Sequence, residues 1–309
     1  FFSQLVILQK YPIFISFSQK TKSTDPTFII YDELCIALLS TILSFCRTKI
    51  YEKLYLLYHF AVLNRVYNAV GAEMIFFITQ RDPFFIDSFF ETFDKFGKKY
   101  TIINLPNFNK GFTRAVKRTY NLYGFNGFLY LLGIKIVKLM RPIQFANMNK
   151  QYNFKSIDEA KNILSNLNNE DIVISLSAPS KIPVDWFAQV KAKINIHCGK
   201  LPKYAGVMPI FWQINDGLDE ISITFQDLAE NIDTGKVFFE KKIKPSYSLF
   251  ETTRLAKRQS AHLLNEFLPN VGSNIKNVQN GQLSSDNLVL RKFPTNKEIK
   301  DFKKIHRLV

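Results

Sequence analysis

Residues 75–105 contain an apolar run, a mixed segment and a second apolar run, and this order constrains the fold more than any other feature of the chain. Residues 75–79 predict a buried strand, and residues 84–96 place apolar and polar side chains at helical spacing. Residues 100–105 predict a second strand, which Pro106 closes. A strand, a helix and a strand at this pitch are typical of the opening of a parallel α/β sheet.

Further elements predicted downstream extend this sheet. Residues 158–167 have the spacing of a helix. Strands are predicted over residues 171–176, 192–198, 221–225 and 236–242. Neither G-x-G-x-x-G nor G-x-x-x-x-G-K-[ST] occurs, so the sequence supports neither a nicotinamide site of the Rossmann type nor a P-loop.

Residues 1–73 differ in composition from the rest of the chain. The first methionine is Met74, and residues 1–70 contain none of the twelve glycines, which a domain normally uses at turns and helix ends. We interpret residues 1–73 as an N-terminal extension, helical or disordered, and non-native sequence is one explanation for it. The alternatives are a small helical packing element and a membrane or targeting segment. The apolar residues 35–46 are fewer than the ~20 needed to cross a bilayer.

The chain is strongly basic, with 41 Lys+Arg, 26 Asp+Glu and a formal net charge of +15. Between Lys95 and Lys155 there are twelve basic residues and no acidic one. Residues 112–140 interleave aromatic and basic side chains, as expected for a helical face that contacts an anionic membrane or a phosphate-bearing ligand. The alternative is an ordinary pair of surface helices with the polar face in water. Gly124 and Gly127 argue against one long helix.

Cysteine usage indicates a reducing compartment. Three cysteines cannot form a disulfide framework, and no C-x-x-C pair offers a zinc site. We therefore expect a cytoplasmic protein.

Asn195, His197 and Asp233 are the residues whose types and spacing suggest catalysis. Asn195 and His197 lie two apart on a predicted strand, so their side chains point to one face of the sheet. Asp233 lies in a polar loop between two later strands. A carboxamide can stabilise an oxyanion, an imidazole can carry protons near neutral pH, and a carboxylate can orient that imidazole, so the set suits acyl transfer. On these residues alone, a structural histidine and an ordinary Asp-Thr-Gly turn remain open as alternatives.

The surrounding segment resembles the folate-dependent formyltransferase family. Residues 194–217 are INIHCGKLPKYAGVMPIFWQINDG, and Ile-Asp-Thr-Gly follows at residues 232–235. The family, which includes methionyl-tRNA formyltransferase, glycinamide ribonucleotide transformylase and the sugar N-formyltransferases, has an Asn-x-His, a distant Asp and a Leu-Pro-x-Tyr loop between them. The resemblance covers residues 74–265, and residues 292–305 look like the short tail of the sugar-modifying members.

The resemblance implies both a fold and a domain organisation. The expected fold is a Rossmann-like, mostly parallel α/β sheet with helices on both faces. Residues 74–265 would form the catalytic domain, residues 1–73 an extension and residues 266–309 a short C-terminal tail.

The resemblance also implies a role for each matched residue. Asn195 would bind the formyl oxygen and the developing oxyanion, and His197 would stabilise that charge and relay a proton. Asp233 would hold the imidazolium and help to remove the proton from the attacking amine. The donor would be 10-formyltetrahydrofolate and the acceptor a primary amine, and no metal is needed for this chemistry.

Binding residues are expected on either side of these three. Ser177, Ala178, Gln226 and Asn231 would pair with the pterin through main-chain groups, because α/β sheets bind ligands at the carboxyl ends of their strands. Lys200, Lys203 and Tyr204 would contact the acceptor, with solvated loop lysines as the alternative interpretation.

Two departures from the family pattern affect substrate identity. Cys198-Gly199-Lys200-Leu201-Pro202 replaces the frequent Pro-Ser-Leu-Leu-Pro, and Ala205 stands where many relatives have Arg. Cys198 is not expected to be a nucleophile, because neighbours on a strand face opposite ways.

The acceptor predicted from the sequence is an amino-sugar nucleotide, whose diphosphate suits the basic residues 95–155. About forty-four residues follow Asn265, too few for the β-barrel with which tRNA formyltransferases grip nucleic acid. Methionyl-tRNA and a formyltetrahydrofolate hydrolase remain the enzymatic alternatives. A basic protein that binds a membrane surface or a nucleic acid is the non-enzymatic one, and a homodimer is possible.

Overall fold

The computed structural model describes residues 73–80, 82, 84–106, 112–140, 144–276 and 288–306. All of the predicted N-terminal extension except Glu73 lies outside these residues, as do the apolar residues 35–46.

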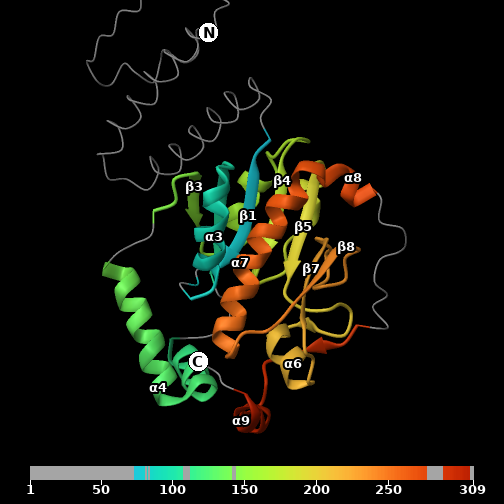
Figure 1. Cartoon of the computed structure of the whole chain (residues 1–309). Coiled ribbons are helices and arrows are strands. Elements are labelled where there is room, and N and C mark those ends of the chain that lie inside the picture. Colours follow the sequence, from blue (N-terminus) through green and yellow to red (C-terminus); the bar gives the residue numbers. More distant parts are fainter. Residues whose placement is uncertain are drawn as a thin grey trace, which may run out of the picture. The chain divides into compact units, whose positions relative to one another are not determined.

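A seven-stranded sheet forms the centre of the described domain, in the order β3-β2-β1-β4-β5-β7-β8 (Figure 1). The five strands from β3 to β5 pair in parallel, whereas β7 and β8 are antiparallel to their neighbours. The mostly parallel α/β sheet predicted from the sequence is confirmed. The strands are β1 Ile75–Gln80, β2 Tyr100–Leu105, β3 Met148–Asn153, β4 Ile172–Leu176, β5 Ala192–His197, β7 Ile221–Asp227 and β8 Val237–Ile243.

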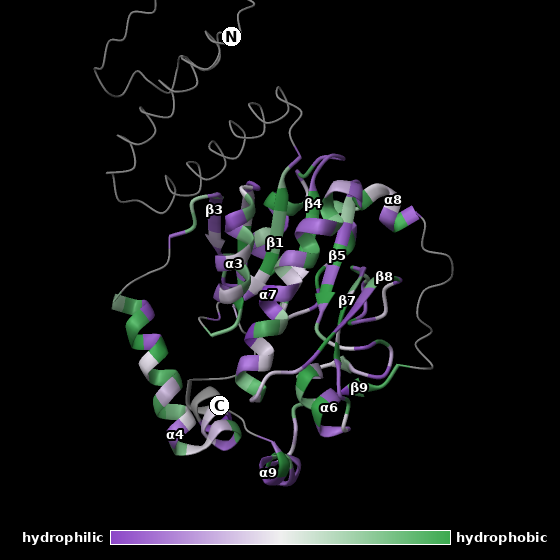
Figure 2. Ribbon diagram, in the orientation of Figure 1, coloured by the Kyte–Doolittle hydropathy of each residue, from purple (hydrophilic) through white to green (hydrophobic). Residues whose placement is uncertain are grey.

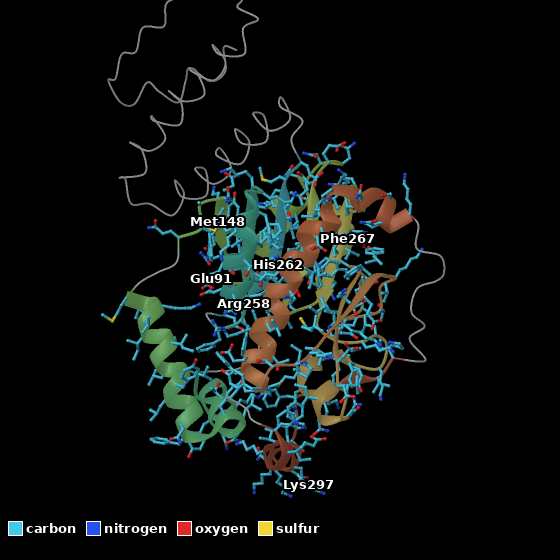
Figure 3. The ribbon with its side chains drawn as sticks, in the orientation of Figure 1. Glu91, Met148, Arg258, His262, Phe267 and Lys297 are labelled. Carbon is cyan, nitrogen blue, oxygen red and sulfur yellow. The ribbon has the colours of Figure 1, made fainter. Side chains whose placement is uncertain are left out.

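Helices pack against this sheet, and α3 and α7 lie side by side across the face seen in Figure 1. Phe267, near the end of α7, lies against the ring of Phe225 in β7 at 5.6 Å (Figure 3). The α-helices are α3 Ile86–Phe93, α4 Phe112–Met140, α5 Lys161–Leu164, α6 Pro209–Asn215, α7 Leu249–Phe267, α8 Val271–Lys276 and α9 Asn296–Ile305.

An aromatic cluster joins β1 and β2 to α3. Phe77 is fully buried, and its ring lies 5.2–5.4 Å from those of Phe89, Phe90 and Phe93 on α3. The ring of Tyr100 on β2 stacks on Phe90 at 5.5 Å. Because central parallel strands are covered on both faces, their sequences are continuous apolar runs, which is the pattern recognised in residues 75–79 and 100–105.

Two elements differ from the sequence-based expectations. The edge strand β3 has the polar sequence MNKQYN and was not predicted; it pairs in parallel with β2, from Tyr100–Met148 to Asn104–Asn153. The helix predicted over residues 158–167 is a 3₁₀ turn followed by α5. After α5 the main-chain N–H groups of Asn166 and Leu167 bond to carbonyls three residues back instead of four, which tightens the chain into a turn and ends the helix.

Helix α4 is interrupted at Gly124, which has φ 72° and ψ −174°. Glycine adopts this conformation without a steric penalty because it has no Cβ. The break predicted from the two glycines is therefore confirmed at Gly124, and α4 consists of two helical segments of different direction.

The C-terminal segment packs against the loop that follows β5. A short parallel pair joins β6 (Ala205–Gly206) to β9 (Leu290–Arg291). Trp212 Nε1 on α6 donates to the Lys292 carbonyl at 3.0 Å. Helix α9 follows, and its Phe302 stacks on Phe211 of α6 at 4.6 Å.

Candidate active site

Strand β5 places Asn195 and His197 on the same face of the sheet, as the alternation of a strand requires. Its antiparallel neighbour β7 sets Gln226 opposite Asn195 and Thr224 opposite His197. Both predicted catalytic side chains on β5 are thereby directed toward the loop between β7 and β8, which carries Asp233.

The carboxylate of Asp233 contacts both predicted catalytic residues of β5. Its Oδ1 atom accepts hydrogen bonds from Asn195 Nδ2 at 3.1 Å and from Gln226 Nε2 at 3.0 Å. The same oxygen lies 3.4 Å from His197 Nδ1, and Oδ2 accepts from the Gly206 main-chain N–H at 2.7 Å. The three residues singled out in the sequence are therefore in contact.

The backbone of Asp233 is left-handed, with φ 56°. Aspartate and asparagine tolerate this region better than other residues with a Cβ. The Ile-Asp-Thr-Gly turn therefore does more than reverse the chain, because it turns the carboxylate inward, where it is only 7% exposed.

His197 is held by an acceptor at each ring nitrogen. Its Nε2 atom lies 2.7 Å from the Tyr204 carbonyl oxygen, and Nδ1 faces the Asp233 carboxylate. A carbonyl and a carboxylate only accept, so the ring satisfies both when both nitrogens carry hydrogen. A positive ring beside the site can stabilise a nearby oxyanion through its charge. A proton relay through Nε2 requires that its bond to Tyr204 be exchanged.

The loop after His197 is fixed by side chains of α6 and β7. Gln213 Nε2 on α6 donates to the Cys198 carbonyl at 3.0 Å, and Gln213 Oε1 accepts from the Ser222 main-chain N–H at 2.9 Å. Thr224 Oγ1 donates to the Gly199 carbonyl at 2.8 Å. A Cβ at Gly199 would stand 2.7 Å from His197 Nε2, so the close approach of this loop to the imidazole requires glycine.

Two of the predicted pterin-binding residues lie at the carboxyl end of β4. Ser177 has the left-handed φ of 53°, and its Oγ accepts from Lys257 Nζ of α7 at 2.8 Å. Ala178 follows it and is half-buried. These positions are at the sheet edge where ligands of α/β proteins bind.

Gln226 and Asn231, the other two, lie on either side of the turn before Asp233. Gln226 is fully buried, and its side chain contacts Asp233 instead of the open side of the sheet. Asn231 is exposed, and its Oδ1 accepts from Lys181 Nζ at 2.9 Å.

The predicted acceptor residues differ in exposure. Lys200 and Lys203 are exposed on the loop, whereas the Tyr204 side chain is only 1% exposed. The Tyr204 hydroxyl donates to Asp216 Oδ2 at 3.1 Å; burial and this carboxylate both raise the pKa of the phenol, so it remains a donor. In this structure Tyr204 contributes to the site through its carbonyl oxygen rather than its ring.

Cys198 is buried and is a free thiol. Its side chain belongs to the apolar core. It does not join Asn195, His197 and Asp233, in agreement with the expectation that it is not a nucleophile.

Sequence reasoning missed the groups that support the three residues. The Gly206 N–H and the Tyr204 carbonyl are main-chain atoms, which leave no residue-type signal. The side chain of Gln226 also gave no signal, because the strand ISITFQD alternates apolar and polar residues and Gln226 occupies one of its polar positions.

A family model matches the part of the chain that contains the site. Residues 141–266 match the family model described as Formyl transferase, and this range contains Asn195, His197 and Asp233. The match covers 126 of the 309 residues. The resemblance seen in the sequence is thereby confirmed.

The relatives include proteins with different acceptors. The chain is 43% identical over 53 residues to the methionyl-tRNA formyltransferase of Desulfotalea psychrophila, covering 17% of this chain and 16% of the relative. It is 30% identical over 86 residues to the GDP-perosamine N-formyltransferase of Brucella melitensis, covering 26% of this chain and 33% of the relative. Both alignments span less than half of the relative's length.

Solved structures of formyltransferases are also similar to this chain. The 4-N formyltransferase from Francisella tularensis is 15% identical, with a TM-score of 0.45, and the match covers 76% of this chain and 88% of that one.

Proposed function

We propose that this protein transfers a formyl group from 10-formyltetrahydrofolate to a primary amine. The observation that carries this proposal is the contact of Asn195, His197 and Asp233 within a segment that matches the Formyl transferase family model. A carboxamide and an imidazole on one strand, gathered on the buried carboxylate of a loop residue, are the groups that acyl transfer to an amine requires.

Asn195 is suited to hold the formyl oxygen. It is the most exposed of the three residues, and its amide nitrogen carries two hydrogens, of which one is donated to Asp233. The second can be donated to the oxygen on which negative charge develops. The positive charge of a doubly protonated His197 ring would stabilise the same oxygen.

Asp233 is suited to accept the proton that the attacking amine loses. Its carboxylate accepts three hydrogen bonds, from Asn195, Gln226 and the Gly206 N–H, so no side-chain reorganisation is needed when the proton arrives. The expected roles of Asn195 and Asp233 are compatible with this geometry. For His197 the geometry favours the electrostatic role over the relay.

For the acceptor, we propose the amine of an amino-sugar nucleotide. Two observations support it: the similarity to a GDP-perosamine N-formyltransferase, and the acid-free, basic residues 95–155, which suit a diphosphate. Similarity to methionyl-tRNA formyltransferases favours a second candidate acceptor, the amino group of methionyl-tRNA. We further propose that the reaction takes place in the cytoplasm, since the protein holds a buried free thiol.

An acceptor screen tests this function. The full chain is incubated with 10-formyltetrahydrofolate and, separately, with amino-sugar nucleotides, with methionyl-tRNA and with no acceptor, and tetrahydrofolate and formylated product are measured. Product from an amino-sugar nucleotide, absent in the Asp233→Asn variant, is the expected result. Formylated methionyl-tRNA alone would overturn the proposed acceptor but not the reaction, and formate release without an acceptor would identify a hydrolase. No folate turnover under any condition would refute the function.

A further inference from the structure

Helix α4 carries an apolar face that points away from the protein. After the break at Gly124, the residues of its inner face are half-buried or buried and recur at helical spacing: Gly127, Leu131, Ile134 and Lys138. Lys138 Nζ fixes the orientation, because it forms ion pairs of 2.9 Å with Asp87 and 3.5 Å with Glu91 on α3. The opposite side of this segment therefore faces outward.

The outward face is apolar instead of polar. Phe125, Leu129, Leu132, Ile136 and Leu139 are all exposed, and their spacing of four, three, four and three residues places them in one stripe. Leu139 is 83% exposed and Phe125 61%. Figure 2 shows apolar residues along this part of α4. A surface helix of a soluble protein normally shows the reverse pattern, so a continuous apolar stripe in solvent indicates a contact surface.

The stripe lies beside basic residues that attract anionic ligands. No acidic residue occurs between Lys95 and Lys155, and Lys117 and Lys135 of α4 are exposed. Tyr120, on the segment before the break, and Tyr130, whose ring also contacts Phe250 of α7 at 5.7 Å, are each nearly half exposed. Apolar side chains accompanied by lysines and amphipathic aromatic rings are the composition of helices that lie in the headgroup region of anionic membranes.

The geometry of α4 decides against a transmembrane span. Residues Lys117–Met140 are long and apolar enough by composition to cross a bilayer. The non-helical Gly124 lies within this range and leaves sixteen continuous residues, 125–140, about 24 Å long at 1.5 Å per residue. A span needs about 20 residues, and Lys138 is committed to α3.

We propose that the outward face of α4 docks this protein on an anionic lipid membrane, with the stripe from Phe125 to Leu139 inserted at the headgroup boundary. Charge favours this occupant over a second copy of the chain, because Lys135 is exposed beside the stripe while Asp87 and Glu91 are paired with Lys138, so two copies would bring exposed positive charges together. The apolar stripe favours lipid over a nucleic acid, because the phosphate backbone that dominates nucleic-acid binding makes no favourable contact with exposed aliphatic side chains. The proposal does not depend on the identity of the acceptor.

Vesicle sedimentation tests the docking surface. The full chain is sedimented with vesicles of phosphatidylcholine alone and of phosphatidylcholine with 30% phosphatidylserine. We expect binding to the anionic vesicles that weakens as salt is added. The double variant Leu132→Gln/Ile136→Gln should bind at least tenfold more weakly, and Lys135→Gln should bind roughly fivefold more weakly, since each basic residue near the surface contributes about 1 kcal/mol.

Val289→Gln is the matched control, because it replaces an exposed aliphatic side chain outside α4 and should leave vesicle binding unchanged. Circular dichroism and the thermal midpoint of each variant establish that the fold is retained. Equal sedimentation of the wild type and the double variant would overturn the proposal. Failure of the wild type to sediment with anionic vesicles would also overturn it. If analytical ultracentrifugation then showed a wild-type dimer that the double variant does not form, the stripe would be a contact between two copies of the chain.

Discussion

Asp233 illustrates how one residue position combines a backbone requirement with a chemical one. The turn needs a residue that tolerates φ 56°, and the site needs a carboxylate whose two oxygens accept three hydrogen bonds and face the His197 ring. Asparagine would meet the first need but not the second. This difference allows the two contributions to be separated by mutation.

Asp233→Asn should therefore lower kcat for formyl transfer by about 10²–10⁴, the usual contribution of a positioned general base. The backbone keeps its left-handed conformation, but the new amide N–H faces a donor whose hydrogen the carboxylate oxygen accepted, so the unfolding free energy should fall by roughly 1–3 kcal/mol without loss of the fold. Steady-state kinetics and urea unfolding measure the two quantities. A rate within threefold of the wild type would show that this carboxylate takes no part in the reaction, and unfolding of the variant would indicate a structural role.

Gln226 acts on the same carboxylate from β7. Its Nε2 donates to Asp233, while its buried Oε1 has no protein partner among the described residues. An unpartnered buried oxygen costs roughly 1–3 kcal/mol, about as much as the hydrogen bond to a charged group contributes. Stability and activity should therefore respond differently when the amide is removed.

Gln226→Met retains the length of the side chain and removes both polar atoms. We expect an unfolding free energy within about 1 kcal/mol of the wild type and a kcat roughly tenfold lower, with a shifted pH–rate profile, because Asp233 loses one of its orienting donors. Urea unfolding and the pH dependence of kcat are the measurements. An unchanged pH profile would mean that Gln226 does not position Asp233.

At the scale of elements, the C-terminal segment supports the site from outside. Strand β9 pairs with β6, whose Gly206 N–H holds Asp233, and a Cβ at Gly206 would overlap the Arg291 carbonyl. Gly206 also has φ 91°, which favours glycine. The C-terminal segment and the loop after β5 are therefore packed together as one unit, and α9 packs this unit against α6.

Phe302→Ala should separate this unit from α6. The Phe302 ring is 1% exposed and stacks on Phe211, so its removal should lower the unfolding free energy by roughly 3–5 kcal/mol, as for other buried phenylalanines. Lys297→Ala on the exposed side of the same helix is the control and should change stability by less than about 0.5 kcal/mol. Equal unfolding midpoints in urea for the two variants would show that α9 is not part of the cooperative unit.

At the scale of the whole molecule, stability depends on buried titratable groups at the sheet edge. Asp82 follows β1, and its Oδ1 accepts from the main-chain N–H groups of Phe84 at 2.8 Å and Phe85 at 3.2 Å. Burial raises the pKa of this carboxyl above its usual value of 3.8, and the two main-chain hydrogen bonds, followed by the charge of Lys257 on α7, only partly offset the increase. Ionisation of the Asp82 carboxyl is therefore less favourable in the folded protein than in the unfolded chain.

Asp82→Asn should consequently stabilise the protein at neutral pH. Below pH 3.8 the carboxyl is protonated in both states and carries no penalty; as the pH rises toward the raised folded-state pKa, the wild type loses stability that the variant keeps. Asparagine retains the Oδ1 acceptor for both N–H groups. Urea unfolding at pH 4 and pH 7 measures the difference, and a stability gap that does not widen with pH would contradict the assignment.

Local sequence signals determined much of this protein. Continuous apolar runs identified the central strands, because a parallel strand is buried on both faces wherever it lies. The spacing of Asn195 and His197 placed them on one face, and the glycine at 124 predicted a break in α4. Residue type also singled out Asp233, and the resemblance to formyltransferases gave it a role with Asn195 and His197, because no local pattern connects its loop to the strand.

Only the tertiary structure decided the rest, because the deciding contacts join residues distant in the chain. The polar edge strand β3 exists through main-chain pairing with β2, and the support of Asp233 by Gly206 and Gln226 depends on how β6 and β7 meet β5. The outward direction of the α4 stripe depends on the ion pair between Lys138 and Asp87. Periodicity shows that a helix has an apolar face, but only its packing partners determine whether that face is buried or left in solvent.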